Sequence, residues 1–88
     1  MKTIKLKHPV VHDDFTIRAV TITRIPDTAI PEIRAAANEG LGDFFEAAVA
    51  AMIRLPRETV RQLDLADFRN LAAFLEEACP NQLLRGRG

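Results

Sequence analysis

Two histidines and one cysteine are the side chains most able to bind a metal or attack a substrate. His8 and His12 lie four residues apart, but they fall in a predicted strand and turn and do not share one helical face. No cysteine or cluster of carboxylates completes a metal site around them. Cys79 follows a predicted helix, where the carboxyl end disfavours a thiolate, and it has no neighbouring base. The sequence therefore predicts neither a metal site nor a catalytic nucleophile.

The charged side chains give no sign of acid–base chemistry or phosphate binding. Glu76 and Glu77 are expected on the solvated face of a helix. The arginines of the second half alternate with acids, and no glycine-rich phosphate loop is present. The chain has no tyrosine or tryptophan on which a nucleic acid base could stack. We therefore expect a binding protein without enzymatic activity and without a cofactor.

Composition indicates one small domain of 88 residues with zero net charge. A single cysteine excludes a disulfide within the chain and is compatible with a reducing compartment. No stretch of about 18 apolar residues exists, so we expect no membrane span. The basic start MKTIKLK is not followed by the apolar region of a signal peptide. A cytoplasmic protein is the expectation.

Residues 1–25 are predicted to form a β-hairpin. Residues 3–10 alternate between apolar and polar, with Pro9 suited to an edge strand. Residues 11–14 read as the turn and residues 15–25 as the return strand, rich in β-branched side chains. Apolar residues change faces along the return strand, which predicts a bulge near Arg18-Ala19.

Residues 31–80 are predicted to be helical. Pro31 opens a short helix that ends at Asn38 or Glu39, with Gly40 as a left-handed cap. Asp43 is the expected N-cap of a helix over residues 44–54. Leu55-Pro56 ends that helix, and Pro56 begins a two-turn helix over residues 57–63.

The last helix should begin after Asp64 as N-cap, cover residues 65–78 and end at Cys79-Pro80. Asp67 is expected on its polar face, and residues 81–88 are expected to be a flexible tail. The apolar side chains at helical spacing are Leu65, Phe68, Leu71, Ala72, Leu75 and Ala78. Together the elements predict an α+β fold, an N-terminal hairpin followed by three to four helices in one domain.

The helix over residues 44–53 is apolar around most of its circumference. A chain this short has few ways to cover every side of such a helix, so we expect self-association or a helical partner there. Its small side, formed by Ala47, Ala50 and Ala51, suits close helix approach. If this side faces outward, a charge at Ala47 or Ala50 is expected to weaken association and leave the fold largely intact.

The run LPRETVRQLDLADFRNLAAFLEEA, residues 55–78, resembles the C-terminal half of small phage tail assembly chaperones. These are the gene 41-like or E-like tail assembly proteins of Mu-type and P2-type phages. The opening IKLKHPV, residues 4–10, is similar to the usual start of this family. The residues that carry the C-terminal resemblance are Leu55, Pro56, Leu63, Asp64, Leu65, Ala66, Asp67 and Phe68.

The resemblance implies a protein that holds the phage tape measure protein soluble until tail tube subunits polymerise around it. It implies the tape measure protein as partner, with the tail tube protein, a frameshifted longer form of the chain and further copies of it as additional candidates. Neither a nucleic acid nor a membrane is expected as a partner. Apolar helical grooves would suit this task. The expected partner-binding residues are Phe44, Phe45, Ala47, Ala48, Ala51, Met52, Leu65 and Phe68.

A small dimeric DNA-binding regulator or antitoxin with an N-terminal β-ribbon is the alternative interpretation. Its DNA contacts would be Lys5, Lys7, Arg18 and Arg24, since residues 1–24 carry a net positive charge. The neutral net charge of the whole chain counts against it.

A first prediction concerns the cap of the last helix. Asp64→Ala should lower the free energy of unfolding by about 0.5–2 kcal/mol, because the helix loses the acceptor for an unpaired N–H. Urea unfolding of the two proteins measures this loss. Unchanged stability combined with lost partner binding would show that Asp64 is a binding residue and not a cap.

Overall fold

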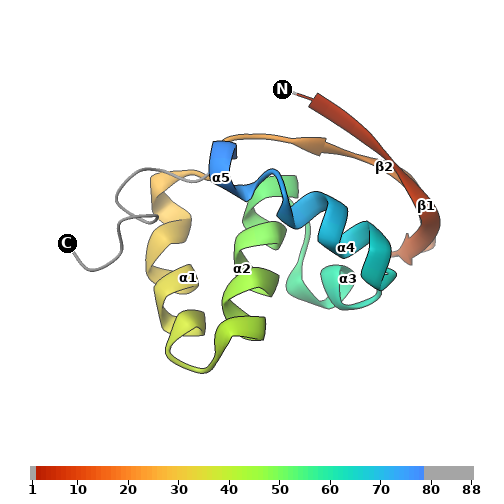
Figure 1. The fold of residues 1–88 in the computed structure, drawn as a ribbon. Helices are drawn as coiled ribbons and strands as arrows, with labels where there is room; N and C mark the ends of the chain where they lie inside the picture. Colours follow the sequence, from red (N-terminus) through yellow and green to blue (C-terminus); the bar gives the residue numbers. More distant parts are fainter. Residues whose placement is uncertain (1, 79–88) are drawn as a thin grey trace.

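The structure is a computed structural model that describes residues 2–78, arranged as a β-hairpin over a layer of helices (Figure 1). The hairpin of β1 (Lys2–His12) and β2 (Phe15–Ile22) is antiparallel. A short 3₁₀ turn, η1 (Asp27–Ala29), leads from it into five helices. The expected α+β class with an N-terminal hairpin is confirmed. The expected helix end at Cys79-Pro80 and the tail at 81–88 lie outside the described residues.

The hairpin turn is shorter than expected, because Val11 and His12 belong to β1. Only Asp13 and Asp14 connect the strands, with φ angles of 49° and 67°. Two consecutive residues with positive φ match the twist of the flanking strands in tight hairpins. Aspartate tolerates these angles better than most residues, so the sequence suits the turn.

Strand pairing slips in the middle of the hairpin. Lys5 pairs with Ala19, but the next pair is Val10 with Ile17, so the irregular segment of β1 lies opposite Arg18. The prediction placed the bulge correctly along the hairpin, but the extra residues belong to β1. Along β2 the residues that face the helices change from odd to even positions between Ile17 and Val20. Because the strand pairing slips at this point, apolar residues on both sides of the slip can still face the helices.

Helix α1 (Ile30–Ala37) begins with proline in its first turn, as predicted, and ends at Asn38. Gly40 does not cap it in the left-handed helical region: its φ of 153° and ψ of 166° are open mainly to glycine. Gly40 is instead the N-cap of α2 (Leu41–Ile53). Asp43 therefore lies in the first turn of α2, where it can pair with a neighbouring helix, and not at the cap.

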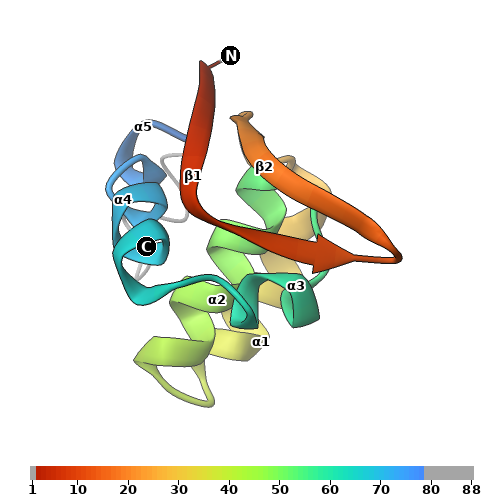
Figure 2. The same ribbon diagram turned by 90° about the vertical axis from the view of Figure 1, so that its right-hand side faces the viewer.

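Helix α2 lies at the centre of the core and contacts β2 and the helices on either side of it. The chain itself covers most of this helix, more than expected, because the hairpin packs on one side while α1 and the later helices pack on others (Figure 2). Self-association through α2 stays a prediction. Ala47 and Ala50 are buried, so the alanine side does not face outward, which was the condition for tolerating a charge there. The buried residues of α2 are Ala47, Ala48, Val49, Ala50, Met52 and Ile53.

Three short helices complete the layer: α3 (Arg57–Arg61), α4 (Leu65–Ala72) and α5 (Leu75–Ala78). Pro56 precedes α3 as its N-cap and is not its first residue, and α3 is shorter than the predicted helix. The single helix predicted over residues 65–78 is interrupted, because the N–H of Phe74 donates to the carbonyl of Leu71, three residues back, at 3.0 Å.

The apolar stripe of α4 and α5 contributes to the core only in part. Leu71, Leu75 and Ala78 are buried, whereas Phe68 is half-buried and Leu65 is exposed. The stripe therefore has a buried centre and one exposed end, next to the start of α4.

Leu71, which is 0% exposed, provides a test of this core. Leu71→Ala should lower the free energy of unfolding by about 2–5 kcal/mol through lost burial and the cavity left behind. Leu65→Ala is the matched control and should cost under about 1 kcal/mol, because Leu65 is largely exposed. Urea melts with equal losses for the two variants would contradict this assignment.

Candidate functional site

Asp67 is a buried carboxylate that joins α4 to β1. Its Oδ1 accepts the backbone N–H of Lys7 and its Oδ2 that of His8, each at 2.9 Å. The side chain is therefore not on the solvated face that the helical pattern predicted, and Asp67 is only 3% exposed. Lys7 and His8 lie where β1 leaves its pairing with β2, so Asp67 supplies acceptors for the N–H groups of this irregular segment.

The surroundings of Asp67 favour its ionised form. Burial raises the pKa of this carboxyl group, but the two backbone hydrogen bonds and the charges of His8 and Lys7 outweigh it and hold the pKa below its usual value. A carboxylate that accepts two N–H groups is a strong, charge-assisted contact.

Asp64 is the N-cap of α4, as predicted. Its side chain accepts the backbone N–H of Ala66 at 3.0 Å, and its carbonyl accepts that of Phe68 at 2.8 Å. The Nε2 atom of His8 lies 3.9 Å from the Asp64 carboxylate. The two aspartates of the Leu-Asp-Leu-Ala-Asp string thus begin α4 and fix it to the hairpin.

A cluster of charges fixes α3 against α2. The carboxylate of Glu46 accepts from Nε of Arg57 at 2.7 Å and from Nε of Arg61 at 2.9 Å. Arg57 also lies 3.4 Å from Asp43, in the first turn of α2. Burial raises the pKa of Glu46, but the two arginines outweigh it, so the pKa is lowered. This cluster forms a rigid charged border beside an apolar hollow.

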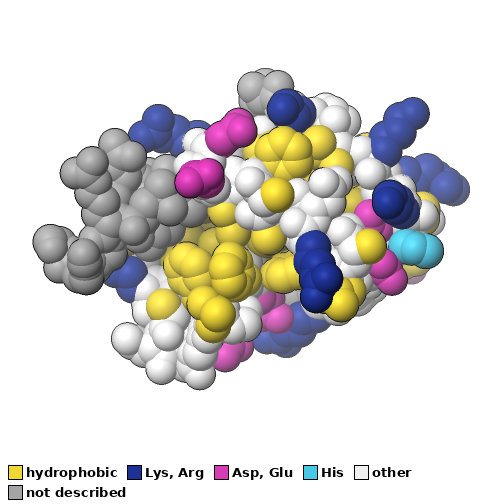
Figure 3. All heavy atoms as spheres, in the orientation of Figure 1, with side chains coloured by type: hydrophobic (Ala, Val, Ile, Leu, Met, Phe, Trp, Pro, Cys, Tyr) yellow, Lys and Arg dark blue, Asp and Glu magenta, His cyan; other side chains and the backbone are white. Residues whose placement is uncertain are grey.

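That hollow has a volume of about 300 Å³ and lies between α2, α3 and the start of α4. One large apolar side chain on its rim, Leu65, is 62% exposed. Leu41, at the start of α2, is 72% exposed but is not among the residues that line the hollow. In Figure 3 hydrophobic side chains reach the surface over the helical layer, among Lys and Arg side chains. The residues that line the hollow are Gly42, Glu46, Val60, Arg61, Leu63, Leu65 and Phe68.

The structure separates the eight expected partner-binding residues into two groups. Ala48 and Met52 are 0% exposed, and Ala47 is buried but lines another hollow, between α1 and α2. The remaining five keep some exposure, and of these only Leu65 and Phe68 line the hollow between α2, α3 and α4. The five are Phe44, Phe45, Ala51, Leu65 and Phe68.

Leu41 and Leu63 are surface-forming residues that the sequence interpretation missed. Leu41 was assigned to a connection before the helix, but it is the first residue of α2 and remains exposed. Leu63 lies in the link between α3 and α4 and lines the hollow. An apolar residue placed directly before a predicted helix core is the signal that could have indicated Leu41.

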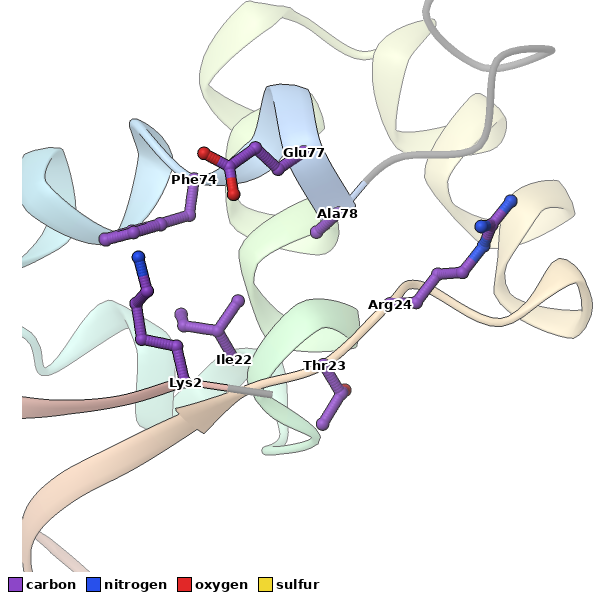
Figure 4. A pocket seen from close by; sticks show the side chains of 7 residues that line it. All are labelled: Lys2, Ile22, Thr23, Arg24, Phe74, Glu77 and Ala78. Atoms are coloured by element: carbon purple, nitrogen blue, oxygen red, sulfur yellow. The ribbon is translucent and has the colours of Figure 1, made fainter.

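A second hollow, of about 340 Å³, lies where the open end of the hairpin meets α5 (Figure 4). Lys2 and Phe74 point toward each other across it, with the ammonium group 5.0 Å from the ring centroid. This contact already uses the aromatic face, and the hollow holds few apolar groups for a helix to bury against.

Residues 2–78 contain no group of three or more His, Cys, Asp or Glu side chains able to hold a metal ion. Within the same residues, no helix has the length and apolar content needed to cross a membrane. The four cations of the DNA-binding alternative, Lys5, Lys7, Arg18 and Arg24, are all exposed on the hairpin or just after it.

Comparison with known proteins gives one match. The family model described as "Phage tail assembly chaperone proteins, E, or 41 or 14" matches residues 3–78. No curated protein and no solved structure matches the chain. The family match covers nearly all described residues, and it favours the chaperone interpretation over the DNA-binding one.

Asp67→Asn should lower the free energy of unfolding by about 1–3 kcal/mol at neutral pH, because the amide offers one acceptor to two N–H groups. The pKa of Asp67 is lower in the folded than in the unfolded protein. Its contribution to the free energy of unfolding is therefore fully present above the unfolded-state pKa of about 3.9, and it is lost as the pH falls through the folded-state pKa. Stability measured from pH 7 down to pH 2 should thus fall less steeply in Asp67→Asn.

Asp64→Asn is the control, because asparagine caps a helix about as well as aspartate. It should be close to wild type at pH 7. Equal stability of Asp67→Asn and wild type at neutral pH would contradict the role given to Asp67.

Proposed function

The chain belongs to the phage tail assembly chaperone proteins, and from this premise we propose that it binds the tape measure protein and keeps it soluble while the tail tube assembles. This task is binding and not catalysis, as expected of a chaperone family. The proposed setting is the cytoplasm of the bacterial host cell. The tail tube protein, a frameshifted longer form and further copies of the chain remain candidate partners.

The exposure of Leu65 on the rim of the hollow, with the half-buried Leu63 and Phe68 in its lining, is the observation that carries this proposal. Large apolar side chains gathered at a concave surface are typical of an interaction site. An amphipathic helix could bury its apolar face there, with residues at i, i+3, i+4 and i+7 as anchors. We therefore propose a helical segment of the tape measure protein as the occupant, contacting Leu65 and Phe68.

The border of the hollow supports the same occupant. Glu46 is neutralised by two arginines, so the border offers a fixed charge distribution and no unpaired buried carboxylate. Arg61 and Asp64 are partly exposed there and could pair with polar residues that flank an apolar helix face. Because only a few large apolar groups are exposed, the chaperone itself can stay soluble while its partner is absent.

Leu65→Glu should weaken binding to the tape measure protein by about tenfold or more, because a charge would enter the apolar contact. Stability should change little, since a glutamate is favourable in the first turn of α4. The measurements are the soluble fraction of co-expressed tape measure protein and the affinity for its purified helical segments.

Ala73→Glu is the matched control: it adds the same charge at an exposed position after α4 that does not line this hollow. It should bind as wild type does. If both variants keep the tape measure protein soluble as well as wild type, the hollow is not the binding site. If wild type itself fails to bind any tape measure segment, the proposed function is wrong.

A further inference from the structure

Strand β2 has one edge without a strand partner among the described residues. The sheet has two strands, and β1 lies on one side of β2 only. No hydrogen bond within the described residues joins Phe15–Ile22 to any element other than β1. The first backbone group after β2 that hydrogen-bonds to another element is the N–H of Thr23, which donates to the carbonyl of Met52 at 3.0 Å. Figure 2 shows β1 on the side of α4 and β2 on the opposite side.

The sequence of this strand, FTIRAVTI, is self-complementary when it is read against itself in the antiparallel direction. In the register that centres on Arg18 and Ala19, Ile17 lies opposite Val20 and Thr16 opposite Thr21. Phe15 lies opposite Ile22. Arg18 lies opposite Ala19, so no two like charges oppose each other. Apolar pairs and threonine pairs of this kind stabilise antiparallel strands.

We propose that two copies of this chain pair through β2 about a two-fold axis perpendicular to the sheet. This operation makes one continuous four-stranded sheet and leaves the helices of both copies on the same side of it. Ile17 and Val20 both face the helical layer, so their pairing extends the apolar face of the sheet. Such an interface is isologous, since each residue contact occurs twice.

The charges at the two ends of β2 complement each other in this arrangement. The same register brings Asp13 and Asp14 of one copy beside Thr23 and Arg24 of the other. Arg54 is also there, because its Nε lies 3.2 Å from the Thr23 hydroxyl. The Asp13 side chain is 83% exposed, with its Oδ2 3.5 Å from Nε2 of His12, so it is accessible to these arginines. The acidic turn of each copy thus meets the basic end of the other copy's strand.

An exposed aromatic residue supports a second copy as the occupant. Phe15 is 73% exposed at the end of the hairpin, the most exposed large apolar side chain among the described residues. Pairing places it beside Ile22 of the second copy, where part of its ring leaves water. A strand from another protein would gain the backbone hydrogen bonds but not this set of matched side chains.

Sedimentation velocity of the purified chain over a range of concentrations tests the proposal. Wild type should form a dimer. The dimer of the double variant Thr16→Lys/Thr21→Lys should have a dissociation constant at least about tenfold above that of wild type. In this variant a lysine of one copy lies opposite a lysine of the other at two symmetry-related places. Thr16→Lys/Thr21→Glu should recover the dimer, because each lysine then opposes a glutamate.

Within one copy these positions pair with Val11 and Thr3, which are uncharged, so both variants should fold alike. Circular dichroism and urea melts check this. Leu65→Glu should dimerise as wild type does, because the hollow is not part of the edge. A wild type that stays monomeric would overturn the proposal. Equal dimerisation of the two double variants would place the interface on another face and overturn it as well.

Discussion

The contact between Asp67 and β1 is the constraint on which the two layers depend. A two-stranded hairpin is marginal alone in water, so it must pack on the helices. Its pairing slips between Lys5 and Val10, and two consecutive N–H groups of the slipped segment donate to one carboxylate, about sixty residues away in sequence. Without that carboxylate these N–H groups would lose their acceptors in the contact between the layers. The irregular strand and the buried acid therefore require each other.

The same packing determines which apolar surface remains exposed. Because the hairpin, α1 and the short helices pack around α2, most of its alanine side chains are buried in the core. The charge cluster around Glu46 joins α3 to α2, while Leu41 and Leu65 remain exposed. Among the helices, the large exposed apolar side chains thus lie at the first residues of α2 and α4.

Local chemistry explains what could be predicted from the sequence. The hairpin follows from alternation, the cap at Asp64 from residue type, and the burial of Leu71 from helical spacing, all of which depend on near neighbours. The role of Asp67 could not be predicted, because helical spacing places it with polar residues and its partners come from β1. The exposure of Leu41 and the break at Phe74 were missed for a related reason, since both follow from how short helices fit around α2.

The two proposed surfaces lie on different elements, and this separation has a consequence for a chaperone. Pairing through β2 uses the edge of the sheet, whereas the hollow lies between α2, α3 and α4. With the helices of both copies on one side of a shared sheet, a dimer would present two hollows to the same partner. A long protein with repeated amphipathic helices could then occupy both, and the second contact would form at a high effective concentration. Two weak apolar sites joined in this way can hold a partner firmly yet release it stepwise. Release site by site is what a protein needs when its partner must pass into a growing tube.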